Sequence, residues 1–304
     1  MPAVYTPVMQ HATVIATFSR RMRLRMDDGT EVEARIKGKR LKPVCGDRVT
    51  VEPLTDESDW LIKGIEERRN ELSRPNQRGQ PEVLAANLDY LLAVAAAEPR
   101  ADWFVIDRYL CAAELMGIEA GVIFNKIDLV DQEPTAELDN YRGIGYDVVA
   151  CSAETGTGVE EIGNLLQSRC GIIVGQSGVG KSSIINRLIG EELQRTSEIS
   201  DKWREGRHTT VNSVMIPLPG GGVIIDSPGV RDYAPALESS VVAAQGFREI
   251  RAAADGCRFA NCRHLREPGC AVKAKVENGD ISARRYESYK RIVNLTEQLT
   301  EGRY

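Results

Sequence analysis

Apolar and polar residues alternate in short runs through the first quarter of the chain. A period of two predicts β-strands, because successive side chains of a strand point to opposite faces of a sheet. The predicted strands are residues 13–17, 21–26, 31–36, 47–51 and 60–65. Asp28-Gly29, between the second and third runs, is typical of a tight hairpin turn. Short strands in such close succession predict a small β-barrel. Among small barrels the OB type is a common nucleic-acid binder, although barrels of other topology give the same pattern.

Further along the chain, apolar runs of strand length alternate with stretches of helical spacing. The predicted strands are residues 91–97, 120–124, 147–151, 171–174, 214–218 and 222–225. The predicted helices are residues 103–116, 134–141, 158–168 and 181–189, the first with Asp102 as its N-cap and Gly117 as its C-cap. Strands that alternate with helices predict a mostly parallel α/β sheet, whose loops gather at the carboxyl ends of the strands.

A polar stretch rich in proline and glycine, residues 73–81, predicts a linker. We therefore expect an OB-like, RNA-binding domain at residues 1–74 and an α/β domain at residues 82–237. Residues 238–304 then form a small, mainly helical C-terminal domain, with a last helix at residues 282–300.

The formal net charge of −5 is distributed unevenly along the chain. Residues 1–75 carry a net charge of +2, residues 76–245 carry −11, and residues 246–304 carry +4. Basic ends around an acidic middle indicate that the ends contact a polyanion, although solvated surface charge is the alternative explanation. Arg284-Arg285 and Lys290-Arg291 lie on the predicted last helix, where we expect them to contact phosphates.

The chain has no pattern typical of membrane insertion or secretion. No apolar run approaches the roughly 18–20 residues that cross a bilayer, and residues 1–10 lack the charged and apolar regions of a signal peptide. We therefore expect a cytoplasmic protein. Its scattered cysteines are then predicted to be small buried apolar side chains: Cys45, Cys111, Cys151 and Cys170.

A complete match to the phosphate-binding pattern G-x-x-x-x-G-K-[ST] follows a predicted strand and opens a predicted helix. The matching residues are Gly175, Gln176, Ser177, Gly178, Val179, Gly180, Lys181 and Ser182. Glycines at these positions let backbone N–H groups turn toward phosphate oxygens. Lys181 is expected to reach the β- and γ-phosphates as a catalytic group, and Ser182 to bind magnesium.

The base is predicted by Asn125-Lys126-Ile127-Asp128, which ends a predicted strand. The Asp128 carboxylate can accept hydrogen bonds from both N1–H and N2–H₂ of guanine, a pair of donors that adenine does not offer. Ser152-Ala153-Glu154 ends the next predicted strand, where a backbone amide can contact guanine O6. The two segments together favour guanine over adenine.

Two further segments are expected to respond to the γ-phosphate. Asp226-Ser227-Pro228-Gly229 ends another predicted strand, and suits a magnesium-side Asp226 and a catalytic Gly229 amide that senses the phosphate. Residues 203–210 read as a mobile loop, in which Thr210, or alternatively Thr209, completes the magnesium shell. His208 either orients the attacking water or is a structural loop histidine.

These motifs follow one another in a rotated order. Most GTPases place the phosphate loop first and the N-K-x-D segment last, whereas here Asn125 and Ser152 precede Gly175. A sheet can keep the same spatial site when its ends are joined elsewhere. The C-terminal domain then directly follows the segment that ends at Gly229.

Three cysteines and one histidine crowd together near the C-terminus: Cys257, Cys262, His264 and Cys270. Thiolate and imidazole ligands in this number suit a closed, tetrahedral, structural zinc site. Disulfides are the alternative, disfavoured by a reducing cytoplasm and by the interposed histidine. Metal binding would supply folding energy to a small basic tail.

The combined order of these motifs resembles the RsgA (YjeQ/YloQ) family of circularly permuted ribosome-biogenesis GTPases. The resemblance implies a late-acting assembly factor of the small ribosomal subunit, whose GTP hydrolysis is stimulated by the subunit and coupled to release. It implies a circularly permuted P-loop GTPase domain, nucleotide contacts that extend to Ser183, and one zinc ion on the four cysteine and histidine ligands. The implied partners are the small subunit and its rRNA, and we expect a monomer.

Val230 stands where Ras-type enzymes place a water-orienting glutamine. A valine cannot orient water, so we expect slow intrinsic hydrolysis that His208 or a ribosomal element accelerates. The same feature leaves open a regulatory scaffold, in which GTP only stabilises a contact with another protein or RNA. A permuted GTPase that serves the large subunit is a further alternative.

Overall fold

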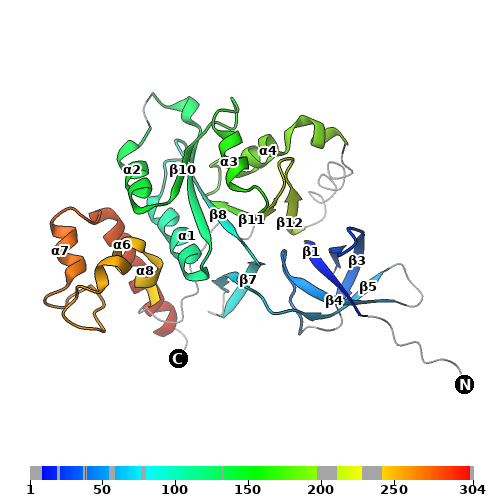
Figure 1. The fold of residues 1–304 in the computed structure, drawn as a ribbon, viewed down its shortest axis with the longest axis horizontal. Coiled ribbons are helices and arrows are strands. Elements are labelled where there is room, and N and C mark those ends of the chain that lie inside the picture. The colour runs from blue at the N-terminus through cyan, green and yellow to red at the C-terminus, as the bar shows by residue number, and fades with distance from the viewer. Residues whose placement is uncertain are drawn as a thin grey trace, which may run out of the picture.

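The computed structural model describes residues 9–18, 21–36, 38, 40–54, 59–76, 80–131, 133–196, 211–227 and 242–301. Figure 1 shows an N-terminal barrel, a central α/β domain and a C-terminal group of helices, with the barrel and these helices on opposite sides of the α/β domain. The expected loop 203–210 and Pro228, Gly229 and Val230 lie outside the described residues.

The barrel consists of five strands: β1 (Gln10–Phe18), β2 (Arg21–Met26), β3 (Glu31–Ile36), β4 (Arg48–Pro53) and β5 (Trp60–Ile65). They run in the order β1-β2-β3-β5-β4, and β1 also pairs with β4, which closes the barrel. Alternate side chains point inward, so that Val14, Leu24, Val49 and Ile62 are fully buried in its core. The five-stranded, OB-like barrel predicted from the sequence is confirmed.

The expected linker, residues 73–81, lies at the turn end of a β-hairpin, so its two ends are paired strands rather than irregular chain. Strands β6 (Glu71–Pro75) and β7 (Pro81–Ala86) pair antiparallel, with Pro75 opposite Pro81 at the turn. Leu72 and Ala85 are fully buried in the core of the α/β domain. The prolines sit where strand pairing ends, and a proline there sacrifices no interior ladder hydrogen bond.

The α/β domain has six strands in the order β10-β9-β8-β11-β13-β12. Five of these strands are parallel and β12 is antiparallel, which confirms the predicted mostly parallel sheet. The strands are β8 (Tyr90–Ala96), β9 (Glu119–Asn125), β10 (Asp147–Ala150), β11 (Cys170–Gly175), β12 (Val211–Pro217) and β13 (Val223–Asp226). The helices are α1 (Trp103–Met116), α2 (Thr135–Ile144), α3 (Val159–Leu165) and α4 (Lys181–Thr196).

Helix α1 begins and ends where its capping residues predict. The Asp102 side chain accepts hydrogen bonds from the amides of Phe104 and Val105, and Gly117 adopts the left-handed conformation at the other end. Helix α3 is shorter than predicted, because Gly158 is left-handed before it and the chain turns after Leu165.

Strand β12 joins the two domains into one continuous sheet. It pairs with β13 on one side and with the barrel strand β1 on the other, so that the barrel is hydrogen-bonded directly to the α/β domain. The pairing leaves one eleven-stranded sheet rather than two separate ones.

The C-terminal region consists of the short helix η3 (Val242–Gly246) and helices α6 (Arg248–Ala254), α7 (Ala271–Glu277) and α8 (Ala283–Glu301). Its apolar core includes Phe247, Ile250, Tyr289 and Ile292, and it also takes in Cys111 of α1. The region therefore packs on helix α1, beside which it lies in Figure 1.

The predicted phosphate contact of Arg285 is wrong. Its guanidinium is fully buried and donates to Asp107 at 2.7 Å and to both carboxylate oxygens of Glu249, at 2.8 and 3.0 Å. Arg284 donates to the other oxygen of Asp107 at 2.7 Å, and the Tyr141 hydroxyl also donates to Asp107. Although burial opposes it, the charges of Asp107 and Glu249 raise the pKa of Arg285 well above its usual value. Both arginines join α8 to α1 through Asp107, and the buried Arg285 is not accessible to a polyanion.

No described helix is long and apolar enough to cross a membrane. None of the seven cysteines forms a disulfide, which contradicts the disulfide alternative. Cys45, Cys111 and Cys151 are buried and Cys170 is partly buried, as predicted for small apolar side chains.

Candidate nucleotide site and metal centre

The sequence motifs meet at one edge of the α/β sheet. Asn125 ends β9, Ser152 follows β10, Gly175 ends β11 and Asp226 ends β13. Because these four strands and β8, which lies between β9 and β11, all run parallel, their carboxyl ends lie at the same edge of the sheet. The rotated order in the sequence thus yields one spatial cluster of phosphate and base motifs.

The phosphate loop is held by glycines at its two ends. Gly175 has φ +142°, and a Cβ atom there would lie 2.3 Å from the carbonyl oxygen of Val94. Gly180 has φ +93°, and a Cβ atom there would lie 2.3 Å from the Asn125 amide nitrogen. Side chains at these two positions would force the loop away from its neighbours on β8 and β9.

Lys181 lies at the start of α4, and its Nζ donates to the carbonyl oxygens of Gly175 and Gln176 at 2.7 and 2.6 Å. The ammonium group therefore lies inside the phosphate loop. Ser177, Gly178, Ser182 and Ser183 are exposed on the same loop and the first turn of the helix, whereas Val179 is buried. A helix that begins at a glycine-rich loop presents its free N–H groups to an anion.

Asn125 joins three of the predicted segments. It is 1% exposed, and its amide nitrogen donates to the Val179 carbonyl oxygen at 2.9 Å. Its amide oxygen accepts from the Ala153 N–H at 3.1 Å. The side chain thereby fixes the phosphate loop and the 152–158 loop relative to strand β9.

The base segment turns sharply after Asn125. Lys126 is left-handed, with φ 64°, and residues Ile127–Leu129 form the short helix η1. The Ile127 amide donates to the Cys151 carbonyl oxygen at 3.2 Å, which ties this turn to the end of β10. Asp128 is exposed, and its carboxylate is available to a ligand from solvent.

Ser152 is buried, and its hydrogen bonds stabilise the loop to which it belongs. Its hydroxyl accepts from the Thr155 amide at 3.1 Å, and its backbone N–H donates to the Thr157 carbonyl oxygen at 3.0 Å. The loop contacts helix α4, where the Arg187 guanidinium donates to the Thr155 carbonyl oxygen at 3.3 Å. Sequence reasoning missed Arg187, because it lies outside every motif.

Asp226 is partly buried at the end of β13, opposite Val214 of β12. The other residues predicted to act on the γ-phosphate, which are His208, Thr209, Thr210 and Gly229, lie outside the described residues. Ser182 and Asp226 supply the hydroxyl and carboxylate oxygens that suit magnesium.

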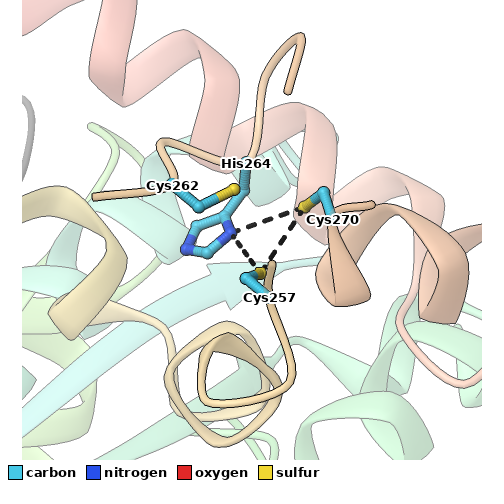
Figure 2. Close-up of side chains that lie close together, drawn as sticks. All are labelled: Cys257, Cys262, His264 and Cys270. Carbon is cyan, nitrogen blue, oxygen red and sulfur yellow. Dashed lines mark hydrogen bonds between the residues drawn. The ribbon is translucent and has the colours of Figure 1, made fainter. Parts of the chain in front are cut away.

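The cysteine and histidine cluster forms a compact metal centre. The ligand atoms of Cys257, Cys262, His264 and Cys270 all lie within 4.8 Å of one another, and Figure 2 shows the four side chains converging. The Cys257 sulfur lies 3.4 Å from His264 Nδ1 and 3.9 Å from the Cys270 sulfur. A tetrahedron with zinc–sulfur and zinc–nitrogen bonds of about 2.3 and 2.1 Å has edges of about 3.5–3.8 Å.

The local environment acts differently on the ligand groups. Burial raises the pKa of the Cys262 thiol to about 12, which opposes its ionisation, whereas Cys257 and His264 are shifted toward their metal-binding forms. Burial alone would raise the pKa of the Cys257 thiol. Hydrogen bonds from the backbone N–H groups of Ala271 and Val272, at the start of α7, outweigh this effect and lower the pKa. Burial lowers the pKa of His264, which favours the neutral imidazole. Thiolate and neutral imidazole are the forms that ligate a metal.

Residues outside the four-ligand pattern hold the metal loop, and sequence reasoning missed them. Glu267 accepts hydrogen bonds from the amides of Arg263, Leu265 and Arg266. Burial raises the pKa of its carboxyl group, but the backbone amides outweigh burial and lower this pKa to about 2. On α8, the hydroxyls of Tyr286 and Tyr289 donate to the carbonyl oxygens of His264 and Arg263. The spacing of three between the tyrosines was the only sequence signal that they share a helix face.

The comparison with known proteins gives consistent matches over the whole chain. The family model described as RsgA GTPase matches residues 65–235. The chain is 38% identical to the small ribosomal subunit biogenesis GTPase RsgA of Photorhabdus laumondii over 301 residues, which cover 95% of this chain and 86% of the relative. It is 40% identical to the protein of the same name from Marinobacter nauticus over 266 residues, covering 85% and 76% of the two chains.

Two solved structures share the fold. YjeQ from Thermotoga maritima superimposes with a TM-score of 0.73 at 28% identity, covering 95% of this chain and 99% of that one. YloQ, described as a circularly permuted GTPase, gives a TM-score of 0.72 at 26% identity and covers 98% of both chains. With its motifs in the same rotated order, the chain belongs to the RsgA family of circularly permuted GTPases and hydrolyses GTP.

Proposed function

We propose that this GTPase binds the small ribosomal subunit and its rRNA during late assembly, and that the subunit stimulates hydrolysis and thereby its own release from the enzyme. The observation that carries the proposal is the meeting of guanine, phosphate and magnesium motifs at one sheet edge, in a chain whose relatives are named small ribosomal subunit biogenesis GTPases. The barrel at residues 1–74 and the C-terminal domain at residues 238–304 supply the RNA-facing arms of the acidic domain at residues 82–237.

The predicted base, phosphate and magnesium residues have separate roles in this proposal. Asp128 accepts from N1–H and N2–H₂ of guanine, while the phosphate loop surrounds the phosphates and Lys181 neutralises charge on the β- and γ-phosphates. Ser182, Thr210 and Asp226 would hold magnesium, which would supply further positive charge at the transferred phosphoryl group. Gly229 senses the γ-phosphate and His208 orients the water.

Sedimentation tests the proposal. Purified small and large subunits are incubated with the protein and GDP, GTP or a non-hydrolysable analogue, and the bound fraction is measured. We expect the analogue to retain the protein on small subunits and GDP to release it. Binding to large subunits alone, or equal binding in all nucleotide states, would reject this function. We expect the protein to be a monomer before it binds the subunit.

Val230 favours one competing function, a scaffold in which GTP only stabilises a contact with another partner. A scaffold retains its partner without turnover. Measured phosphate release in the presence of small subunits separates the two functions.

Replacing Asp128 by asparagine is expected to shift the preference from guanine to xanthine. The lost charge-assisted hydrogen bonds are worth about 1.5–3 kcal/mol, so affinity for GTP should fall between about tenfold and 150-fold. Calorimetry with GTP and XTP measures both affinities. The exposed Asp139→Asn variant on α2 is the control, and unchanged GTP affinity in Asp128→Asn would refute the assignment of the base.

We propose zinc as the metal of the four-ligand centre, because three sulfurs and one nitrogen within 4.8 Å of one another form a donor set that suits it. The purified protein should contain one zinc per chain, and Cys262→Ala should lose most of it. Metal analysis of both proteins measures this, with Cys151→Ala as the control, since Cys151 is buried outside the centre. Iron in place of zinc, or full zinc content in Cys262→Ala, would contradict the assignment.

A further inference from the structure

Three buried hydroxyl side chains form a row across the junction between the barrel and the α/β domain. Thr17 of β1 lies directly opposite Ser213 of β12, and the register of β12 with β13 brings Ser213 opposite Ser227. The hydroxyl of Ser213 donates to that of Ser227 at 2.9 Å. The exposed fractions are 7%, 6% and 7%, so solvent hardly reaches the row.

A buried hydroxyl pair specifies register more sharply than apolar side chains do. A slip of one residue would turn Ser213 to the opposite face of the sheet and leave the Ser227 hydroxyl buried without this partner. The cost of such an unpaired group opposes the slip. The pair therefore fixes β12 against β13 where β13 ends at Asp226.

The row begins in another domain. Thr17 belongs to the barrel. Strands β1 and β12 also pair at Ala16–Val214, and after Thr17 the register shifts so that Phe18 pairs with Val211. Val214 in turn lies opposite Asp226. At Ala16 and Thr17 the barrel strand thus pairs with the strand that follows the predicted loop 203–210, and that strand pairs in turn with the strand that carries Asp226.

We propose that Ser213 and Thr17 are positioning residues for Asp226, so that the barrel helps to build the magnesium side of the nucleotide site. This inference rests on the proposed function, in which Asp226 binds magnesium. It differs from that function in giving the barrel an effect on the nucleotide site without any RNA present.

Magnesium titration of the full-length protein tests the inference. GTP hydrolysis is measured against magnesium concentration for Ser213→Ala and Thr17→Val, and GDP affinity is measured separately in EDTA. Loss of one hydroxyl should raise the magnesium concentration for half-maximal hydrolysis by about twofold to tenfold. GDP affinity in EDTA should stay unchanged, which a general loss of structure would not allow. Ser288→Ala, at an equally buried serine on α8, is the matched control.

The reference variant Asp226→Asn separates the two proposals. If Asp226→Asn leaves the magnesium requirement unchanged, the magnesium assignment fails and the inference fails with it. If Asp226→Asn raises the requirement but neither hydroxyl variant does, the assignment stands and the inference is wrong. A shift in Ser213→Ala without one in Thr17→Val would reject the part assigned to the barrel. If Ser213→Ala and Thr17→Val lose GDP affinity in EDTA as much as they lose magnesium-dependent hydrolysis, the defect is a general structural one, and the inference is rejected.

Discussion

Replacing Arg285 by methionine is expected to lower the free energy of unfolding by about 3–5 kcal/mol. The variant keeps an unbranched apolar stem but removes the guanidinium group, and it leaves Glu249 without its two guanidinium hydrogen bonds. Asp107, which is fully buried, keeps Arg284 and Tyr141 but loses its contact with Arg285. A buried carboxylate that loses its cation is costly, because solvent does not replace the lost interaction.

Denaturant unfolding of the purified proteins measures this effect. Lys290→Met is the matched control, because Lys290 lies on the same helix but forms an exposed ion pair with Glu287. That exposed ion pair should contribute no more than about 1 kcal/mol to the free energy of unfolding. Similar losses in the two variants would contradict the role of Arg285 as the attachment of α8 to α1.

Replacing Lys181 by alanine is expected to reduce the rate of GTP hydrolysis by about 10²–10³-fold, which corresponds to about 2.7–4 kcal/mol. Lys181 is positioned inside the phosphate loop by the carbonyl oxygens of Gly175 and Gln176. A bound phosphate would offer the ammonium group a charged acceptor in their place. Its charge then lies where negative charge develops during phosphoryl transfer.

Single-turnover hydrolysis with saturating GTP isolates this effect from changes in affinity. Lys275→Ala removes an exposed lysine from α7 and controls for the change in net charge. The prediction fails if Lys181→Ala hydrolyses GTP within about threefold of the unaltered protein, since the loss expected for a removed transition-state donor is far larger.

The elements of this fold follow closely from local sequence patterns. Alternation predicted the barrel strands, and Asp102 and Gly117 predicted both ends of α1 because capping is a local interaction. The nucleotide motifs were found for the same reason, since each is contiguous and ends a strand. The sheet then brings Asn125, Ser152, Gly175 and Asp226 to one edge.

The errors arise where distant residues decide the outcome. Proline and glycine at residues 73–81 suggested a linker, but the ends of this stretch pair as β6 and β7, and Leu72 and Ala85 of these strands are buried in the core of the α/β domain. Arg285 counted as a surface charge in the sequence, whereas its partner Asp107 is 178 positions away. The row of Thr17, Ser213 and Ser227 likewise depends on strand pairing that no local pattern encodes.

The central claim is that this GTPase acts on the small ribosomal subunit. Phosphate release from GTP in single-turnover reactions, with the protein alone, with small subunits and with large subunits, tests it most directly. Slow hydrolysis by the protein alone, a marked acceleration by small subunits and none by large subunits is the predicted result. The same slow rate in all three reactions, or acceleration by large subunits only, would contradict it.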